Sequence, residues 1–131
     1  MTAVDTNILL YVHDSRDLRK RAAAAALVSS LVDGVLLWQV ACEYLANFRK
    51  VGHDPGRAWG YIRELRRAWG LAVPGWDVVD RAEALLESHS LSFWDALLIA
   101  ACLEAGVKRL YSEDFSGYTR VNGLEIMNPL A

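Results

Sequence analysis

The stretch LSFWDALLIAACLEAGVKRLYSEDF, residues 91–115, decides the fold. Ser92 is a typical helix N-cap, a long apolar body follows it, and Gly106 is a typical helix stop. The segment RLYS, residues 109–112, then has the pattern of a short strand. A helix that passes directly into a strand is part of the repeating unit of α/β proteins, so this stretch favours that class.

The same alternation of strands and helices recurs along the rest of the chain. Residues 2–5 read as a strand, and Thr6 or Asn7 is expected to cap a helix that begins at Ile8. The other expected strands are 35–38, 71–73, 109–112 and 124–127, and the other expected helices are 17–33, 40–50, 57–70, 77–90 with Asp77 as N-cap, and 92–106. We therefore expect one α/β domain over residues 1–131, with a mostly parallel sheet of four or five strands and helices on both faces.

Composition excludes several classes of protein. The chain has 131 residues, 53% of them hydrophobic, and a net charge of −2, which indicates a folded globular domain that is not basic overall. Cys42 and Cys102 lie in helical patterns without a CxxC spacing, so no disulfide framework or zinc site is expected. The apolar runs are too short to span a membrane, and we expect a cytoplasmic protein.

Four acidic residues fall where the predicted elements would bring them together. Asp5 interrupts an apolar segment at the end of the first strand, Glu43 and Asp95 lie in expected first turns of helices, and Asp114 follows a strand. Ligands of open α/β sheets bind beyond the carboxyl ends of the strands. Clustered carboxylates are ligands for hard cations such as Mg²⁺ or Mn²⁺, so the four acids predict a metal site.

Each acid also has a structural explanation. Asp95 is the acid of a capping box with Ser92. Glu43 would be stabilised in the first turn of its helix by the positive end of the helix dipole. Asp114 follows polar residues, as a solvated turn residue does. Asp5 is the hardest to explain structurally, because burying an unpaired carboxylate is costly.

The segments AVDTNILLY, WQVACEYL, LSFWDALLIAACLEAGVKRLYSEDF and LEIMNP together resemble the PIN-domain ribonucleases, specifically the VapC toxins of bacterial toxin–antitoxin pairs. The resemblance runs essentially end to end. It implies a three-layer α/β/α domain with an acidic pocket that binds Mg²⁺ or Mn²⁺. It also implies an endoribonuclease that hydrolyses RNA phosphodiester bonds.

The resemblance assigns roles to individual residues by matching motifs. The residues that would hold the metal and carry catalysis are Asp5, Glu43, Asp95 and Asp114, with Asn7 and Ser112 as accompanying polar residues. It further implies a homodimer that an antitoxin of the VapB type silences by covering the pocket. Two departures are Trp38, where relatives more often have a small hydroxylated residue, and the lack of a Gln after SED.

Several surface features are candidate contacts with RNA or with a partner. Positive charge is concentrated in residues 16–21 and in Arg49, Lys50, Arg57, Arg63, Arg66 and Arg67, although solvated helix faces have the same pattern. The tryptophans at 59, 69, 76 and 94 could stack on bases, but core or interface positions are the commoner explanation. We expect the antitoxin at residues 44–69, with Tyr44, Phe48, Trp59 and Tyr61.

Other readings are weaker or remain open. A haloacid-dehalogenase fold needs a second acid at position 7, and a receiver domain needs paired acids at its first strand, but this chain has Asn7 and an isolated Asp5. His13, His53 and His89 are scattered along the sequence, so a metal-free histidine mechanism is poorly supported. An inactive module of the same fold that binds RNA or protein remains the alternative.

Overall fold

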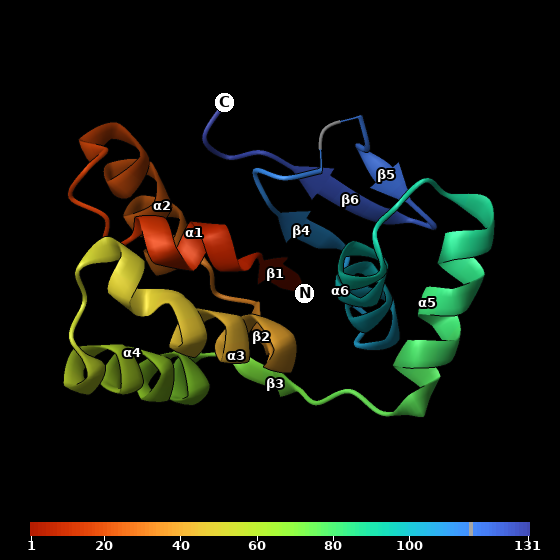
Figure 1. Ribbon diagram of the computed structural model, residues 1–131, viewed down its shortest axis with the longest axis horizontal. Coiled ribbons are helices and arrows are strands. Elements are labelled where there is room, and N and C mark those ends of the chain that lie inside the picture. Colours follow the sequence, from red (N-terminus) through yellow and green to blue (C-terminus); the bar gives the residue numbers. More distant parts are fainter. Residues whose placement is uncertain (116) are drawn as a thin grey trace.

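A computed structural model describes residues 1–115 and 117–131, and it shows a central sheet between two groups of helices (Figure 1). The strands of the described residues are β1 (Thr2–Val4), β2 (Gly34–Leu37), β3 (Gly70–Ala72), β4 (Arg109–Tyr111), β5 (Arg120–Val121) and β6 (Leu124–Met127). They form one six-stranded sheet with the order β3-β2-β1-β4-β6-β5. All neighbouring strands are parallel except β5 and β6, which confirms the predicted mostly parallel sheet.

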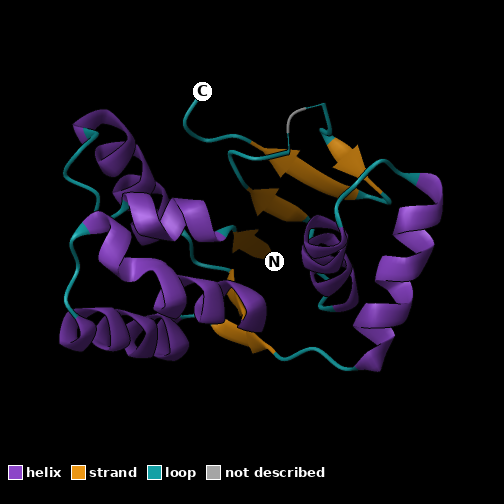
Figure 2. Cartoon of the chain, viewed as in Figure 1, coloured by secondary structure: helices purple, strands orange, loops and turns teal. Residues whose placement is uncertain are grey.

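Helices cover both faces of this sheet, which makes the three layers that the resemblance implied. The helices are α1 (Thr6–Tyr11), α2 (Leu18–Ser30), α3 (Trp38–Asn47), the 3₁₀ helix η1 (Phe48–Val51), α4 (Pro55–Ala68), α5 (Trp76–Ser88) and α6 (Phe93–Glu104). In Figures 1 and 2, α1 to α4 lie on one side of the strands and α5 and α6 on the other. Buried apolar side chains such as Ile8, Ile99 and Leu110 fill the space between the layers.

The sixth strand is an addition to the predicted sheet. β5 has only two residues, too few to produce an alternating pattern. It pairs with β6 through a tight hairpin whose turn residues, Asn122 and Gly123, have φ angles of 48° and 89°. An Asn-Gly pair is the typical signal of such a turn, so the hairpin was detectable from residues 120–125.

Some predicted helix boundaries are wrong by a few residues. Asp5, rather than Thr6 or Asn7, is the N-cap of α1, because its side chain accepts a hydrogen bond from the Thr6 N–H. The helix expected over 17–33 begins after Asp17 but ends at Ser30.

Two further corrections concern acids near helix starts. α3 begins at Trp38, which was expected to end a strand, so Glu43 lies in its second turn rather than its first. α5 begins at Trp76 with Gly75 as N-cap, so Asp77 lies inside the first turn and does not cap the helix. In both cases the helix starts earlier in the chain than predicted.

The tryptophans, for which core or interface positions were the commoner expectation, divide between the core and the surface. Of the four tryptophans considered above, Trp69 is buried, at 7% exposure, and Trp59, Trp76 and Trp94 are exposed. Trp38 is exposed as well. The exposed indole rings are accessible to a ligand or a partner.

The surface expected to meet an antitoxin, residues 44–69, is also less aromatic than predicted. Tyr44 and Phe48 are buried in the core, and Tyr61 is only partly exposed. Among these four residues, Trp59 has the exposed side chain, at 50% exposure. Buried rings cannot contact a partner, so the predicted face loses two of its four aromatic residues.

No helix in the described residues is long and apolar enough to cross a membrane.

Close packing at the start of β2 gives a stability prediction. A Cβ atom added at Gly34 would lie 2.5 Å from ring carbons of Trp69, which is buried and has little room to move. We expect Gly34→Ala to lower the free energy of unfolding by about 1–3 kcal/mol through overpacking. Chemical denaturation measures this change.

The matched control is Gly60→Ala within α4. Nothing lies within 4 Å of a Cβ atom at Gly60, and alanine is a better helix former than glycine. This substitution should raise the free energy of unfolding by roughly 0.5–1 kcal/mol. Equal effects of the two substitutions would contradict the packing argument.

Candidate functional site

The candidate site lies where the strand order of the sheet reverses. The chain builds β1, β2 and β3 toward one edge and then returns to place β4 on the other side of β1. Asp5 directly follows β1 and Ser112 directly follows β4, so both lie at adjacent carboxyl ends. The Asp5 N–H donates to the Tyr111 carbonyl at 2.8 Å, which joins the two strand ends. Ligands of open α/β sheets bind at this kind of switch point.

The Asp5 carboxylate is buried at this switch point. It is 8% exposed, and its two oxygens accept hydrogen bonds from the Thr6 N–H and the Ser112 hydroxyl, each at 2.7 Å. The pKa of Asp5 is raised to about 6, mainly because the carboxyl is buried; the negative charges of Asp114 and Glu43 contribute to the rise, and the two hydrogen bonds oppose it. Among residues 1–115 and 117–131, no positive charge contributes to the shift of the Asp5 pKa.

Two more of the predicted acids are connected to Asp5 through hydroxyl groups. Ser112 Oγ, which donates to Asp5, also accepts from the Asp114 N–H at 3.1 Å. On the other side, the Thr6 hydroxyl donates to Glu43 Oε1 at 3.1 Å. Thr6 therefore links the carboxylates of Asp5 and Glu43, and Ser112 links Asp5 to the backbone of Asp114. The negative charges of Glu43 and Asp114 both act on Asp5, and we call these three residues the acid network. Thr6 was not singled out as a site residue, although its position beside Asp5 in the DTN motif was a signal for it.

The other two predicted residues have no such hydrogen bonds among the described residues. Asp95 lies in the first turn of α6, where its N–H donates to Ser92 Oγ at 3.1 Å, as the capping box predicted. The Asp95 carboxylate itself has no hydrogen bond to a described residue. Both amide atoms of Asn7 are buried and unpartnered in the described part of the chain. The metal-binding, catalytic or supporting roles of all six predicted residues stay predictions, namely Asp5, Asn7, Glu43, Asp95, Ser112 and Asp114.

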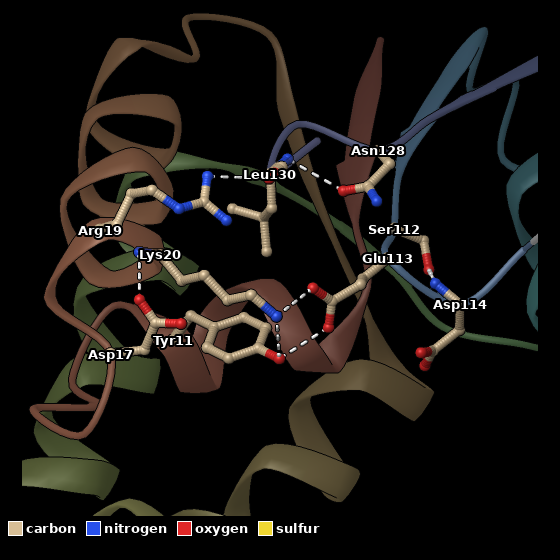
Figure 3. Close-up of polar contacts among 9 residues, drawn as sticks. All are labelled: Tyr11, Asp17, Arg19, Lys20, Ser112, Glu113, Asp114, Asn128 and Leu130. Atoms are coloured by element: carbon tan, nitrogen blue, oxygen red, sulfur yellow. Dashed lines mark hydrogen bonds and ion pairs between the residues drawn. The ribbon is translucent and has the colours of Figure 1, made fainter.

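An ion pair outside the acid network holds the loop that carries Asp114. Glu113 accepts from Lys20 Nζ and from the Tyr11 hydroxyl, both at 2.6 Å, and Lys20 Nζ also donates to Tyr11 at 3.2 Å (Figure 3). Lys20 and Glu113 side chains are each 25% exposed. The contact ties α1 and α2 to the residue between Ser112 and Asp114. Glu113, which is not one of the predicted metal ligands, thus has a structural partner of its own.

Some of the cations expected to contact RNA are already paired within the chain. Within residues 16–21, Arg16 forms a two-point contact with Asp14, with both N···O distances at 2.8 Å. Arg57 lies 3.4 Å from Asp54. Such exposed pairs are weak and a phosphate could replace the carboxylate, so RNA contact by these cations stays a prediction.

The chemistry of the donors fits a hard divalent cation. The acids supply only oxygen ligands, which Mg²⁺ and Mn²⁺ prefer. The amide oxygen of Asn7, two residues after Asp5, is buried and has no hydrogen-bond partner among the described residues. No three His, Cys, Asp or Glu side chains of residues 1–115 and 117–131 converge closely enough to hold an ion as they stand. Like charges keep carboxylates apart when no cation lies between them.

Comparison with known proteins is consistent with this arrangement. The model of the PIN domain family matches residues 2–123 of the sequence. The chain belongs to the PIN domain family. Among curated proteins, none matches the sequence significantly.

Solved structures share the fold of this PIN domain over nearly its whole length. VapC20 of Mycobacterium tuberculosis, described as a sarcin-ricin loop cleaving toxin, has 25% identity and a TM-score of 0.70, covering 92% of this chain and 98% of its own. A toxin–antitoxin complex from Klebsiella pneumoniae has 20% identity and a TM-score of 0.69, covering 98% of both chains. VapBC-1 of nontypeable Haemophilus influenzae has 14% identity and a TM-score of 0.66, covering 99% and 98%.

Two of the three histidines lie together in this PIN domain, although they are far apart in the sequence. His13 stacks on His53 with ring centroids 4.1 Å apart, and it meets the edge of Tyr61 at 4.6 Å. His53 Nδ1 lies 3.0 Å from the Tyr44 hydroxyl. His13 Nε2 is buried without a hydrogen-bond partner among the described residues. The pair joins α1 to the segment before α4, whereas His89 lies elsewhere, beside Tyr118.

This pair predicts a pH-dependent loss of stability. The pKa of His13 is lowered from 6.5 to about 4, mainly by burial, with smaller contributions from the charges of His53 and Arg21. Between these pH values the unfolded chain binds a proton that the folded chain refuses, so stability falls as the pH drops from 6.5 toward 4. We expect His13→Phe, which keeps the stacked ring, to remove roughly 1–2 kcal/mol of this loss. Urea denaturation at pH 7.5 and 4.5 measures it, and identical pH dependence in both proteins would contradict the prediction.

Proposed function

We propose that this PIN domain is a divalent-metal-dependent endoribonuclease that hydrolyses RNA phosphodiester bonds and acts as the toxin of a toxin–antitoxin pair. The observation that carries the proposal is the buried Asp5 at the switch point of the sheet, linked to Ser112 and influenced by the charges of Glu43 and Asp114. Membership of the PIN family and the likeness to solved toxins, one of them described as cleaving the sarcin-ricin loop, support it.

Each residue has a defined part in the proposed reaction. Asp5, Glu43, Asp95 and Asp114 would hold Mg²⁺ or Mn²⁺. Such an ion acidifies a bound water and offsets the charge that develops on phosphoryl oxygens during hydrolysis. Ser112 and Thr6 orient the carboxylates of Asp5 and Glu43 through their hydroxyl groups. The burial of Asp5 keeps this carboxylate away from bulk water, which strengthens its interaction with a cation.

The proposal extends to partners and organisation. Two of the similar structures are described as VapBC or toxin–antitoxin complexes, which supports an antitoxin of the VapB type as the partner of this chain. We also propose that residues 1–131 form a single PIN domain, that two copies form a homodimer, and that the protein acts in the cytoplasm on RNA. The net charge of −2 means that RNA must be held by local groups rather than by the overall field.

The test is cleavage of RNA by the purified protein, with Mg²⁺ or Mn²⁺ and with excess EDTA. We expect new RNA fragments with either metal and intact RNA with EDTA, since carboxylates alone cannot activate water for this reaction. Cleavage that continues in EDTA would refute the metal mechanism. RNA that is bound but stays intact with every divalent metal would support the inactive binding module instead.

A further inference from the structure

A surface pocket of about 320 Å³ adjoins the acid network. Its lining residues are Trp38, Gln39, Cys42, Glu43 and Trp94. The first four come from the start of α3, and Trp94 comes from the first turn of α6. The Gln39 amide approaches the Trp94 carbonyl at 3.4 Å, which links the two helix starts across the pocket. Glu43, one of the predicted metal ligands, is therefore also a wall of this pocket.

Both indoles of the pocket are exposed to solvent. Trp38 is 54% exposed and Trp94 is 65% exposed. Trp94 directly precedes Asp95, and Trp38 lies on the same helix as Glu43, so each indole belongs to a helix that also carries a predicted catalytic acid. Exposed aromatic side chains gathered at a pocket are typical of ligand contacts rather than of core packing.

We propose that Trp38 and Trp94 form a subsite that stacks an unpaired base of the RNA substrate beside the acids. The inference rests on the proposed function, because it takes RNA as the ligand. Every base has a flat π face that stacks on an aromatic side chain, whatever the sequence. A base held against Glu43 places a neighbouring phosphate of the same strand next to the acid network.

The chemistry of the pocket favours a base over a phosphate. Its lining contains no Lys or Arg, and Glu43 would repel a phosphate group. An uncharged, flat base has no such penalty and buries apolar surface of the indoles. Gln39 lines the pocket, and its buried Oε1 has no hydrogen-bond partner in the described residues, so this amide oxygen is an unused acceptor at the pocket.

The pocket also distinguishes unpaired from paired RNA. In a duplex the faces of the bases are stacked on one another, so they are not available to an indole. The substrate class that the subsite favours is thus RNA with unpaired bases, in a loop, a bulge or a single strand. A paired segment would have to open before it could occupy the pocket.

Binding of fluorescein-labelled RNA, followed by anisotropy in EDTA, tests the subsite without cleavage. The probes are a single-stranded oligonucleotide of mixed sequence and the same oligonucleotide annealed to its complement. Trp38→Ala and Trp94→Ala should each weaken single-strand binding about tenfold, because a stacked base contributes about that much. Trp38→Phe should keep most of the affinity, and duplex binding should change little in any variant.

Trp76→Ala is the matched control. Trp76 is 79% exposed on α5 and does not line the pocket, so its removal should leave RNA binding unchanged. If Trp76→Ala weakens binding as much as Trp38→Ala and Trp94→Ala, the effect is a general one of surface aromatic residues and the subsite is refuted.

The Cys42 thiol provides a second, independent measurement. Cys42 is exposed and lines the pocket, whereas Cys102 is fully buried. Single-stranded RNA should therefore slow the reaction of Cys42 with a maleimide, and the duplex should not. Unchanged labelling together with unchanged affinity of both alanine variants would overturn the subsite, even if the protein cleaves RNA. Reduced affinity in a protein that never cleaves RNA would keep the subsite and refute the proposed hydrolase.

Discussion

Asp5→Asn is expected to reduce RNA cleavage by at least about 100-fold while the protein stays folded. The substitution removes a negative charge from the network that Asp5 shares with Glu43 and Asp114. Asparagine caps helices as well as aspartate does, so α1 should keep its N-cap. The free energy of unfolding should change by less than about 1 kcal/mol, because the lost charge was unfavourable in its buried position. Initial rates on a labelled RNA and chemical denaturation measure the two effects.

Asp54→Asn is the control for this substitution. Asp54 is also an N-capping aspartate, since it accepts from the Arg57 N–H at the start of α4, but it belongs to no part of the acid network. It should leave the cleavage rate unchanged. If Asp5→Asn cleaves RNA as fast as Asp54→Asn, the acid network is not the catalytic site.

Divalent metal is expected to raise the melting temperature substantially. A metal present at about 100 times its dissociation constant stabilises the folded state by roughly 2.7 kcal/mol. For a domain of this size that corresponds to a rise in melting temperature of roughly 5–10 °C. The physical reason is that a bound cation would compensate the buried charge of Asp5, whose pKa is raised mainly by burial, and would offset the repulsion from Asp114 and Glu43. Thermal denaturation with Mg²⁺ or Mn²⁺, reversed by EDTA, measures it.

The metal effect should depend on the acids of the network. Asp5→Asn should abolish most of the rise, whereas Asp54→Asn should show all of it. Sodium chloride at the same ionic strength controls for screening of surface charge. An equal rise in wild type and Asp5→Asn would mean that the ion binds elsewhere, and the predicted ligand set would be wrong.

Local patterns were sufficient for most of the fold. Alternating strands and helices predicted the parallel sheet, and Ser92 and Gly106 marked the ends of α6 because caps are local features. Two of the boundaries that were wrong, the starts of α1 and α3, lie where the chain passes from a strand into a helix with one residue or none between them. No loop residue punctuates such a junction, and apolar spacing alone does not locate it.

The candidate site was predictable only in part. Asp5 stood out because an isolated acid in an apolar stretch demands a partner, and it now proves to be buried. The hydroxyl of Thr6 and the clamp of Lys20 on Glu113 were not predicted, because residues far apart in sequence form these contacts. The stacking of His13 on His53 was missed for the same reason.

The sequence by itself determined the fold class, the family resemblance and the identity of the acids, since these depend on composition and local pattern. Only the tertiary structure decided which groups meet. The order of the strands brings the ends of β1 and β4 together, so that Ser112 reaches Asp5. It also leaves Trp38 and Trp94 exposed at one pocket. The physical reason is that hydrogen bonds, burial and charge interactions depend on distances in space, which chain folding sets and sequence separation does not.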